Sequence, residues 1–248
     1  MEGKTTEDIL YITGAGVSAE SGIPTFRGQD GYWTIGSENY TPQEMATRHM
    51  YQNNPAEFLG WYYHRFATYR NHGPNEVHYW LADKNLITQN IDGLDAKAGN
   101  KDYIAVHGRL DQMTFFHTQG EDVTTIQTPW DSIDESLSGN KLTQALLDLF
   151  IIKGKPQLNV SYKPFVLLFD EFYTELYRIT DAQKRMANAD KIIFIGTSFS
   201  VNITQMALET AIAFQTPIEI VDPDPVEIDY ERITYHKMTA LTYINSFG

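Results

Sequence analysis

Side chains able to take part in acid–base or hydrogen-bonding chemistry follow apolar, strand-like runs at four places in the sequence. The four groups are Asn90 with Asp92, His107, Thr197 with Ser198, and Asp222. In an open parallel sheet, ligands bind beyond the carboxyl ends of the strands, so these side chains are candidates for one shared site. A neutral imidazole is the usual general base near pH 7, which makes His107 the candidate base.

Most of these groups also have a purely structural interpretation. A lone histidine beside a glycine, as at His107, is more often structural than catalytic. Asn90 and Asp92 are suited to an Asx turn, in which the side chain binds nearby backbone. The hydroxyls of Thr197 and Ser198 are suited to capping the next helix. The residues alone leave these alternatives open.

A glycine-rich segment follows the first apolar run. Its Gly14-x-Gly16-x-x-Ala19 pattern is typical of a strand–loop–helix that binds a nucleotide pyrophosphate, because backbone N–H groups without side chains can approach phosphate oxygens. The short pattern also fits a plain tight turn. Glycines and a proline then interrupt the helix, and Phe26 and Arg27 lie on the interrupting segment, which we interpret as a lid over a bound cofactor. This predicts a nucleotide site that differs from that of an ordinary dehydrogenase.

Length and composition narrow the class of protein. The 248 residues are 42% hydrophobic and 13% aromatic, enough for one α/β domain with a smaller insertion. A net charge of −13 argues against sequence-independent nucleic-acid binding and favours cationic partners. Without cysteine, disulfides and thiolate metal sites are excluded. The polar N-terminus and the lack of an apolar run of about 18 residues lead us to expect a cytoplasmic protein, monomeric by default, without membrane partners.

Strand-like runs alternate with helical segments, which predicts an α/β fold with a Rossmann-like, mostly parallel sheet and helices on both faces. Strands are expected at residues 8–13, 86–88, 104–106, 165–169, 191–195 and 218–221. Helices are expected within 14–31, over 41–71 with a new start near 54–55, after 74–75, and at 142–152 and 174–189.

Five blocks of the sequence together resemble one protein family. In chain order they are residues 14–28, 88–94, 106–108, 196–198 and 221–223. The first, GAGVSAESGIPTFRG, strongly resembles the cofactor-binding loop of the sirtuins, the NAD-dependent protein deacylases. The other four match further sirtuin blocks in the family's order, so the resemblance spans almost the whole chain.

The resemblance implies that the cofactor is NAD and gives individual residues a role. His107 is the base that deprotonates a ribose hydroxyl, and Asn90 and Asp92 line the nicotinamide pocket. Gln89 lies toward the ribose. Asp222 ends the last expected strand, where a carboxylate can accept both ribose hydroxyls, although many sirtuins have Asn at this position. Because a carboxylate repels a 2′-phosphate, we expect NAD to be preferred to NADP. The other cofactor-binding positions are Gly14, Ala15, Gly16, Ser18, Ala19, Ile23, Phe26, Arg27, Gly196, Thr197 and Ser198.

Tyr62 and Arg65 share a helix face, since residues i and i+3 are neighbours on a helix. Such a pair is commonly only a surface contact. The stretch 54–75, however, resembles the sirtuin subclass that removes acidic acyl groups, in which a Tyr-x-x-Arg pair binds the acyl carboxylate through a bidentate guanidinium. We therefore expect succinyl-, malonyl- or glutaryl-lysine to be preferred to acetyl-lysine.

The insertion after His107 departs from the sirtuin pattern. Typical sirtuins have four zinc-binding cysteines there, and this chain has none. We therefore expect no bound metal, and an insertion held by packing of Phe115, Phe116, Trp130 and Leu142.

The expected peptide-binding segment also departs from the pattern. It comprises Leu168, Phe169, Asp170 and Glu171, where many sirtuins have Phe-Gly-Glu. A side chain at the glycine position is expected to hinder the close approach of a peptide strand. Asp95 is a third departure, because the family usually has histidine there.

The predicted function is an NAD-dependent protein-lysine deacylase that moves an acetyl or acidic acyl group, such as succinyl, from lysine to ADP-ribose with release of nicotinamide. The alternatives are an NAD glycohydrolase or ADP-ribosyltransferase, and a non-catalytic NAD or ADP-ribose sensor. Residues 1–248 are expected to form one sirtuin-like domain. Its Rossmann-like core comprises about 1–31, 82–110 and 160–248, with a helical insertion at about 32–81 and a second at about 111–159 in place of a zinc module.

Overall fold

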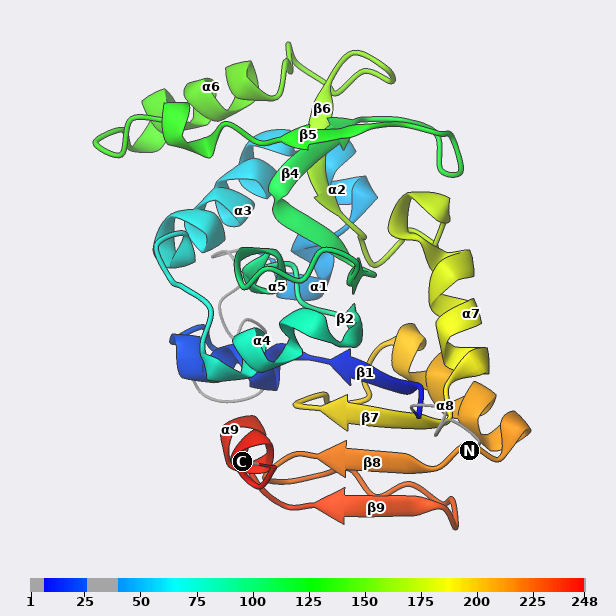
Figure 1. Cartoon of the computed structure of the whole chain (residues 1–248). Coiled ribbons are helices and arrows are strands. Elements are labelled where there is room, and N and C mark those ends of the chain that lie inside the picture. The colour runs from blue at the N-terminus through cyan, green and yellow to red at the C-terminus, as the bar shows by residue number, and fades with distance from the viewer. Residues whose placement is uncertain (1–6, 26–39, 248) are drawn as a thin grey trace.

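The computed structural model describes residues 7–25 and 40–247, which form two lobes (Figure 1). The larger lobe, called the sheet lobe here, is built on a six-stranded sheet with helices on both faces. The other, called the small lobe, is built on a three-stranded sheet with helices packed beside it. No described helix has the length and apolar character that a membrane span requires.

The six strands of the sheet lobe are all parallel. They are β1 (Ile9–Thr13), β2 (Asn85–Thr88), β3 (Ile104–Ala105), β7 (Lys191–Ile195), β8 (Ile218–Val221) and β9 (Ile233–His236). Their order, β3-β2-β1-β7-β8-β9, reverses direction between β1 and β7, as in a Rossmann sheet. The predicted α/β fold with a mostly parallel sheet is confirmed, and the reversal point is where such sheets bind ligands.

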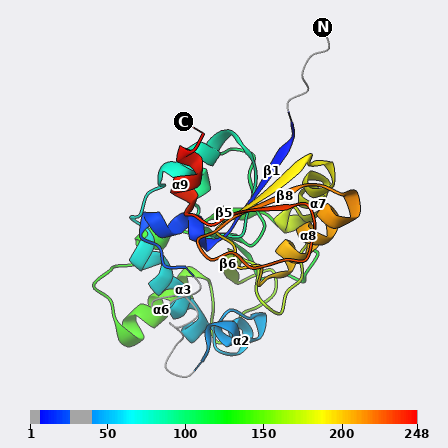
Figure 2. The same cartoon turned by 90° about the horizontal axis from the view of Figure 1, so that it is seen from below.

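Successive side chains of each strand point to opposite faces of the sheet, and both faces are covered by helices (Figure 2). Leu10 and Ile12 of β1 belong to the core on one face, and Tyr11 belongs to the core on the other. The first face is covered by α7 (Ile179–Asn188) and α8 (Asn202–Phe214), the second by α4 (Glu76–Trp80) and α9 (Ala240–Asn245).

The small lobe combines an antiparallel sheet with helices packed beside it. Its strands, in the order β5-β4-β6, are β4 (Gly108–Phe115), β5 (Thr125–Gln127) and β6 (Tyr162–Val166). Its helices are α1 (Pro42–Met45), α2 (Arg48–Asn53), α3 (Pro55–Tyr69) and α6 (Gly139–Leu149), with the 3₁₀ turn η3 (Trp130–Ser132). The short elements η1 (Ala15–Ser21), η2 (Leu81–Asp83), α5 (Leu94–Lys97) and η4 (Glu175–Tyr177) complete the chain.

The start of α3 follows from its sequence. Pro55 occupies the first helical position. An N–H at that position has no acceptor within the helix, so proline, which lacks the N–H, loses no hydrogen bond there. The Asn54 side chain accepts a hydrogen bond from the Glu57 N–H over 3.4 Å and caps the helix. The predicted new helix start at residues 54–55 is confirmed, and it fixes the direction of the helix that carries Tyr62 and Arg65.

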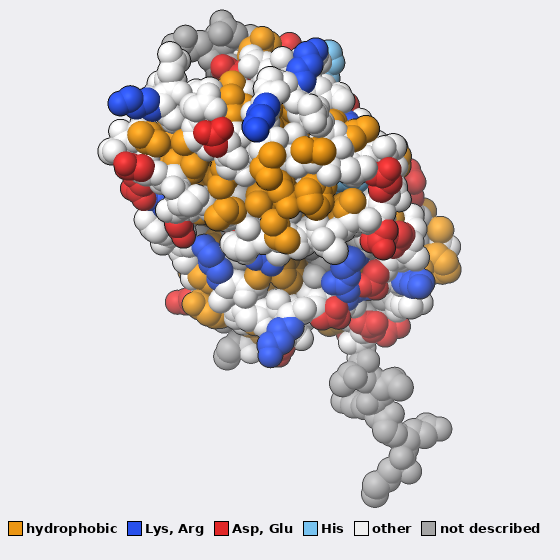
Figure 3. Space-filling view, turned by 90° about the horizontal axis from the view of Figure 1, so that it is seen from above, with side chains coloured by type: hydrophobic (Ala, Val, Ile, Leu, Met, Phe, Trp, Pro, Cys, Tyr) orange, Lys and Arg blue, Asp and Glu red, His pale blue; other side chains and the backbone are white. Residues whose placement is uncertain are grey.

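Aromatic packing holds the insertion together, as predicted for three of four residues. Phe116 and Trp130 belong to the buried core of the small lobe, and Leu142 packs against it. Phe115 instead stacks on Tyr162 of the neighbouring strand, with ring centroids 4.4 Å apart. Figure 3 looks down on this end of the molecule, where hydrophobic side chains gather at the surface. The outer segments of the insertion contribute the exposed residues Ile126, Ile151, Leu158 and Val160.

Several predicted elements have different bounds in the structure. The helix expected at 142–152 lies at Gly139–Leu149, and the helical region 41–71 contains three helices. The strand expected at 165–169 lies at Tyr162–Val166 and pairs with β4, not with the parallel sheet. The helix expected at 174–189 is broken at Arg178, whose φ of 55° places it in the left-handed region and separates η4 from α7. The strands β4, β5 and β9 were not predicted, because their apolar and polar residues do not form a continuous apolar run. The division into core and insertions stays a prediction.

Asp95, one of the departures noted in the sequence, is a buried carboxyl group. It lies in the first turn of α5 and is 2% exposed. Burial, and then the nearby charge of Asp92, raise the pKa of Asp95 to about 7, although a hydrogen bond with Thr88 opposes the shift. The folded protein therefore binds this proton more tightly than the unfolded chain does, so stability falls as the pH rises from about 4 to about 7.

We expect Asp95→Asn to stabilise the protein at pH 8 much more than at pH 4.5. The amide has no charge to desolvate, and the pKa shift corresponds to on the order of 4 kcal/mol, or roughly 10 °C in melting temperature. Thermal unfolding at the two pH values measures the effect, and Asp122→Asn on the exposed surface is the control. An equal change at both pH values would contradict the assignment.

Candidate active site

A cavity of about 920 Å³ lies where the carboxyl ends of the parallel strands face the small lobe. Its volume is near the upper end of the range of about 300–1,000 Å³ typical of ligand pockets. Most residues predicted to bind the cofactor or to carry out chemistry line it. These are Gly14, Ala15, Gly16, Ser18, Ala19, Ile23, Gln89, Asn90, Asp92, His107, Gly196, Thr197, Ser198 and Asp222. Phe26 and Arg27 lie outside the described residues.

The floor of the cavity is a backbone-to-backbone contact between the loops that follow β1 and β7. The Gly16 N–H donates to the Gly196 carbonyl over 2.9 Å, and the Gly14 N–H donates to Ile195 over 3.0 Å. A Cβ at Gly16 would lie 2.5 Å from the Gly196 Cα, so no side chain fits there. These glycines therefore serve close packing of the two loops. Their N–H groups bind the neighbouring loop, and do not point free toward a phosphate as the sequence pattern suggests.

Asn90 and Asp92 share one hydrogen-bonded network with the glycine loop. The Asn90 amide donates to the Gly14 carbonyl over 3.0 Å and to the Ser18 hydroxyl over 3.2 Å. The Ser18 hydroxyl donates to Asp92 over 2.7 Å. The other Asp92 oxygen accepts from the Leu94 N–H over 2.9 Å, which is the Asx turn left open by the sequence. The Asx turn and a place in the site are therefore compatible, because the Asp92 side chain that forms the turn also lines the cavity.

Gln89 and Thr197 join the ends of β2 and β7. The Gln89 amide donates to the Thr197 hydroxyl over 3.0 Å and to the Thr13 carbonyl over 3.1 Å. Helix α8 begins at Asn202 without a side-chain cap, so neither Thr197 nor Ser198 has the capping role. The alternative interpretation of these two residues is therefore wrong, and they remain available to line the cavity.

His107 is held by both ring nitrogens. Its Nδ1 lies 2.9 Å from the Gln89 carbonyl oxygen, which can only accept, so Nδ1 carries the proton. Its Nε2 lies 2.9 Å from the Tyr173 hydroxyl. Burial lowers the pKa of His107 to about 4, although the hydrogen bond to Gln89 opposes the shift. The imidazole is therefore neutral at pH 7, and Nε2 is its acceptor nitrogen.

Tyr173 is a site residue that the sequence did not reveal. It lines the cavity and contacts His107, yet it lies in an irregular segment without periodicity or motif. Its distance from His107 along the chain, 66 residues, leaves no local signal of the contact. Only the pairing of β6 with β4 brings the segment back beside the histidine.

Tyr62 and Arg65 both line the cavity, on the side formed by α3. Tyr62 is buried, and burial raises its pKa above the ordinary value, with Arg65 opposing the shift, so its hydroxyl stays protonated. The Arg65 guanidinium lies over the Trp61 ring, 3.2 Å from the ring centroid, and donates to the Trp61 carbonyl over 3.2 Å. Both residues of the predicted pair thus line the cavity, and the role of the pair in binding an acyl carboxylate stays a prediction.

The expected peptide segment divides its residues between the cavity and α2. Leu168, Phe169 and Glu171 line the cavity. Asp170 is not among the described residues that line it; its two carboxylate oxygens accept from the Arg48 N–H over 2.6 Å and the His49 N–H over 3.0 Å. The carboxylate thereby serves the N-terminus of α2, where a negative charge is favourable.

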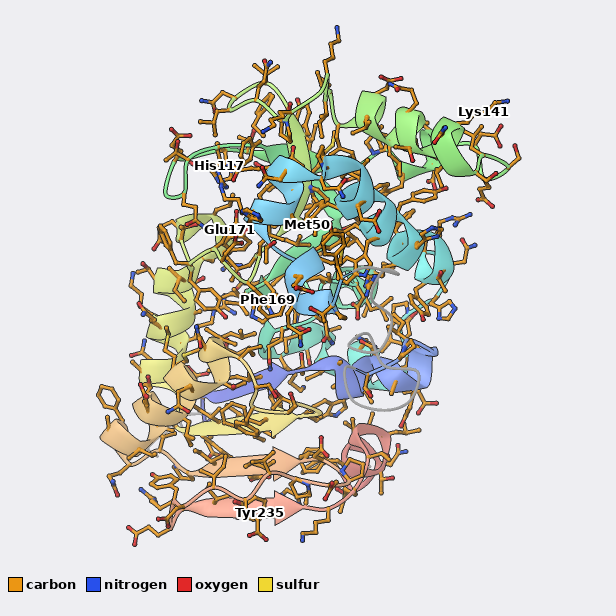
Figure 4. The ribbon with its side chains drawn as sticks, turned by 180° about the vertical axis from the view of Figure 1, so that it is seen from behind. Met50, His117, Lys141, Phe169, Glu171 and Tyr235 are labelled. Carbon is orange, nitrogen blue, oxygen red and sulfur yellow. The ribbon has the colours of Figure 1, made fainter. Side chains whose placement is uncertain are left out.

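Glu171 is the centre of a buried ionic cluster beside α2 (Figure 4). Its carboxylate accepts from Arg48 over 3.0 Å, from the Lys163 ammonium over 3.3 Å and from the Leu168 N–H over 3.2 Å. Arg48 also donates to the His117 carbonyl. Burial lowers the pKa of Lys163, which the charge of Glu171 opposes. The cluster ties the peptide segment to both α2 and β6.

Among residues 7–25 and 40–247, no group of three or more His, Asp or Glu side chains is arranged to hold a metal ion. The expectation of a zinc-free insertion stays a prediction.

Comparison with known proteins identifies the family. The pattern of the Sir2 family matches residues 14–203. The NAD-dependent protein deacylase 1 of Caldanaerobacter subterraneus subsp. tengcongensis is 30% identical over 249 residues, covering 96% of this chain and 91% of that protein. The chain belongs to the Sir2 family. The NAD-dependent protein deacylase of Bdellovibrio bacteriovorus is 33% identical over 81% of this chain and 79% of its own length.

Solved Sir2 structures have the same fold. A Sir2 homologue–NAD complex superimposes with a TM-score of 0.72 at 27% identity, covering 97% of this chain and 88% of that chain. A Sir2 homologue in complex with ADP-ribose gives a TM-score of 0.73 at 27% identity, covering 97% and 90%. The sequence-based assignment to the sirtuins is confirmed, and the cavity of this Sir2 chain lies at the sheet edge where Rossmann-like folds bind nucleotides.

We expect Gly16→Ala to weaken NAD binding at least tenfold and to lower the melting temperature. The added methyl group would meet the Gly196 backbone, which cannot yield as a flexible side chain would. Gly60→Ala is the matched control, because a Cβ there meets nothing within 4 Å and alanine is favoured by about 0.5–1 kcal/mol within a helix. Calorimetric titration with NAD tests both variants. Wild-type affinity in Gly16→Ala would contradict the role given to this contact.

Proposed function

We propose that the chain is an NAD-dependent protein-lysine deacylase that removes acidic acyl groups in preference to acetyl. The observation that carries the activity is a neutral His107 whose proton is fixed on Nδ1, in the cavity that Asn90 and Asp92 also line. The same cavity reaches the Tyr62 and Arg65 pair on α3. One cavity therefore contains a base, an amide and a carboxylate for the nicotinamide, and a guanidinium that can bind the carboxylate of an acidic acyl group.

The residues of the cavity fit NAD. Gly14, Gly16 and Gly196 pack the two loops together at the switch point of the sheet, and all three line the cavity where a dinucleotide would lie. Asp222, at the end of β8, lines the cavity and would hold the ribose hydroxyls. Asn90 would hold the carboxamide. When bound, NAD supplies the ADP-ribose that accepts the acyl group and releases nicotinamide.

The protein's part in the reaction is to position groups and to take a proton. Asn90 and Ser18 hold Asp92 and the glycine loop in one arrangement, which keeps the nicotinamide pocket formed before ligand binds. His107 accepts the proton of a ribose hydroxyl at Nε2, because Nδ1 already carries one.

The acyl-lysine peptide would enter along residues 167–171. The backbone N–H of Leu167 donates to the His107 carbonyl over 2.9 Å, and the backbone N–H of Phe169 donates to the Ala46 carbonyl over 2.9 Å. Since Asp170 caps α2, its side chain serves the helix and not the cavity, which favours access of a peptide despite the missing glycine. Phe169 is exposed and lines the cavity, so it offers an apolar surface to the peptide. Cytoplasmic location and a monomeric state stay predictions from the sequence.

The activity is tested by nicotinamide release from NAD with acetyl- and succinyl-lysine peptides. We expect release to need acyl peptide, to be faster with succinyl peptide, and to fall at least 100-fold in His107→Ala, since a general base contributes about 10²–10⁴-fold. His64→Ala, an exposed histidine on α3, is the control. Release without any peptide would instead favour a glycohydrolase or transferase, and no release would favour a sensor.

The acyl preference is tested by Arg65→Met. Loss of a charge-assisted hydrogen bond worth about 1.5–3 kcal/mol should lower desuccinylation roughly 10- to 100-fold. Deacetylation by the same variant is the internal control and should stay within about threefold of wild type, because acetyl has no carboxylate to bind. Unchanged desuccinylation would disprove the acidic-acyl proposal while leaving the deacylase proposal intact.

The cofactor preference is tested by comparing the affinities for NAD and NADP. We expect NAD to bind more tightly by about 1 kcal/mol or more, since the Asp222 carboxylate would face the 2′-phosphate of NADP. Asp222→Asn should narrow the difference, because the amide carries no charge. Equal affinities in the wild type would contradict the role of Asp222.

A further inference from the structure

The acceptor nitrogen of His107 is already hydrogen-bonded within the protein. The Tyr173 hydroxyl lies 2.9 Å from Nε2, and the two rings are close to parallel, with an interplanar angle of 23°. Tyr173 also lines the cavity. Any ribose hydroxyl that gives its proton to His107 must therefore either displace the tyrosine hydroxyl or pass the proton through it.

The direction of this hydrogen bond is determined by its neighbours. Because the Gln89 carbonyl fixes the His107 proton on Nδ1, Nε2 can only accept, and Tyr173 must donate. Burial raises the pKa of Tyr173 to about 12, while a hydrogen bond with the Ile203 backbone opposes the shift. The phenol thus keeps its proton at pH 7.

Displacement of Tyr173 would disturb more than one contact. Its ring packs against the core between the sheet and the helices α7 and α8. Two residues earlier in the chain, Glu171 is held by the buried ammonium of Lys163 and the partly buried guanidinium of Arg48. The Tyr173 hydroxyl itself is hydrogen-bonded to His107. Proton transfer through the hydroxyl keeps this hydrogen bond and the packing of the ring, whereas displacement of the hydroxyl disrupts both.

We infer that Tyr173 is a catalytic residue that relays the proton from the ribose hydroxyl to His107. The ribose O–H bond breaks as its proton passes to the Tyr173 oxygen, while the original Tyr173 proton passes to Nε2 of His107. The phenol is regenerated, the imidazole becomes imidazolium, and the ribose oxygen is left with the electron pair that attacks the acyl carbon. The relay rests on the proposed deacylase function and specifies how its base reaches the substrate.

The relay is tested with Tyr173→Phe by measuring two rates in the same assay. Exchange of labelled nicotinamide into NAD, in the presence of acyl peptide, needs cleavage of NAD but no base. Formation of O-acyl-ADP-ribose and free lysine needs the base as well. We expect the variant to keep exchange within about twofold of wild type and to lose at least tenfold in acyl transfer.

The control is Tyr235→Phe, which likewise removes a phenol hydroxyl. The Tyr235 hydroxyl accepts a hydrogen bond from the Ile228 N–H. Tyr235 lies on the edge strand β9, away from the small lobe (Figure 4), so both of its rates should match wild type. Thermal unfolding of both variants shows whether either one is poorly folded.

The pH dependence gives a second readout that a purely structural tyrosine would not change. A hydrogen bond donated to Nε2 stabilises the neutral ring, so its loss in Tyr173→Phe should raise the pKa of His107. In a plot of the remaining acyl-transfer rate against pH, the acid limb should then move to higher pH. The other ionisable groups that line the cavity are unchanged in the variant and include Asp92 after β2, Asp111 on β4, Glu171 after β6, Asp222 after β8, and Arg65 on α3.

The outcomes separate the relay from the function on which it rests. Transfer by Tyr173→Phe that equals or exceeds wild type would overturn the relay, as would an equal loss of exchange and transfer. An acid limb that does not move would do the same. A wild type that neither exchanges nor transfers would overturn the proposed function and the relay with it.

Discussion

The contact between Gly16 and Gly196 is the constraint on which the site depends. β1 and β7 are neighbours in the sheet but lie on opposite sides of its topological switch, so the chain leaves them in different directions. Their two loops can meet only backbone to backbone, with an N–H to carbonyl distance of 2.9 Å. This contact brings residues from the first and last thirds of the chain to one edge. Asn90 then binds the same loop through the Gly14 carbonyl, which adds the end of β2 to the assembly.

The small lobe is joined to this edge through buried charge. Glu171 and Lys163 are almost fully buried, and burial of a lone charge would be strongly unfavourable. Each is compensated by further hydrogen bonds, from Arg48 and the Leu168 N–H to the carboxylate, and from Lys163 to the Val166 carbonyl. Such a cluster adds little net stability, but it permits one arrangement of α2, β6 and the peptide segment. In this chain, which has no cysteine, ionic contacts therefore fix the geometry of residues 168–171.

Sequence patterns predict the sheet, and they predict which residues gather around the cavity, because both follow from local rules. Apolar runs identify strands that are buried on both faces, and polar residues directly after them must lie at one edge when the strands are parallel. The same rules missed β4 and β9, whose alternating residues are half-exposed, and Tyr173, which reaches His107 only through antiparallel pairing of distant segments. The hydrogen bonds of Asp170 to the N-terminus of α2 could not be predicted from the sequence either, because His49 lies 121 residues earlier in the chain.

Burial of His107 has two opposite consequences for catalysis. It keeps the imidazole neutral at pH 7, so the acceptor nitrogen is always available, but a pKa of about 4 also makes that nitrogen a weak base. A weak base is effective only if the imidazolium it forms is stabilised as the proton arrives. Asp92 lines the same cavity and is held in place by the Ser18 hydroxyl, whereas the charge of Glu171 is compensated by Arg48 and Lys163. A carboxylate that is fixed before reaction needs no reorganisation to stabilise a developing positive charge, so Asp92 is the better placed of the two for this role.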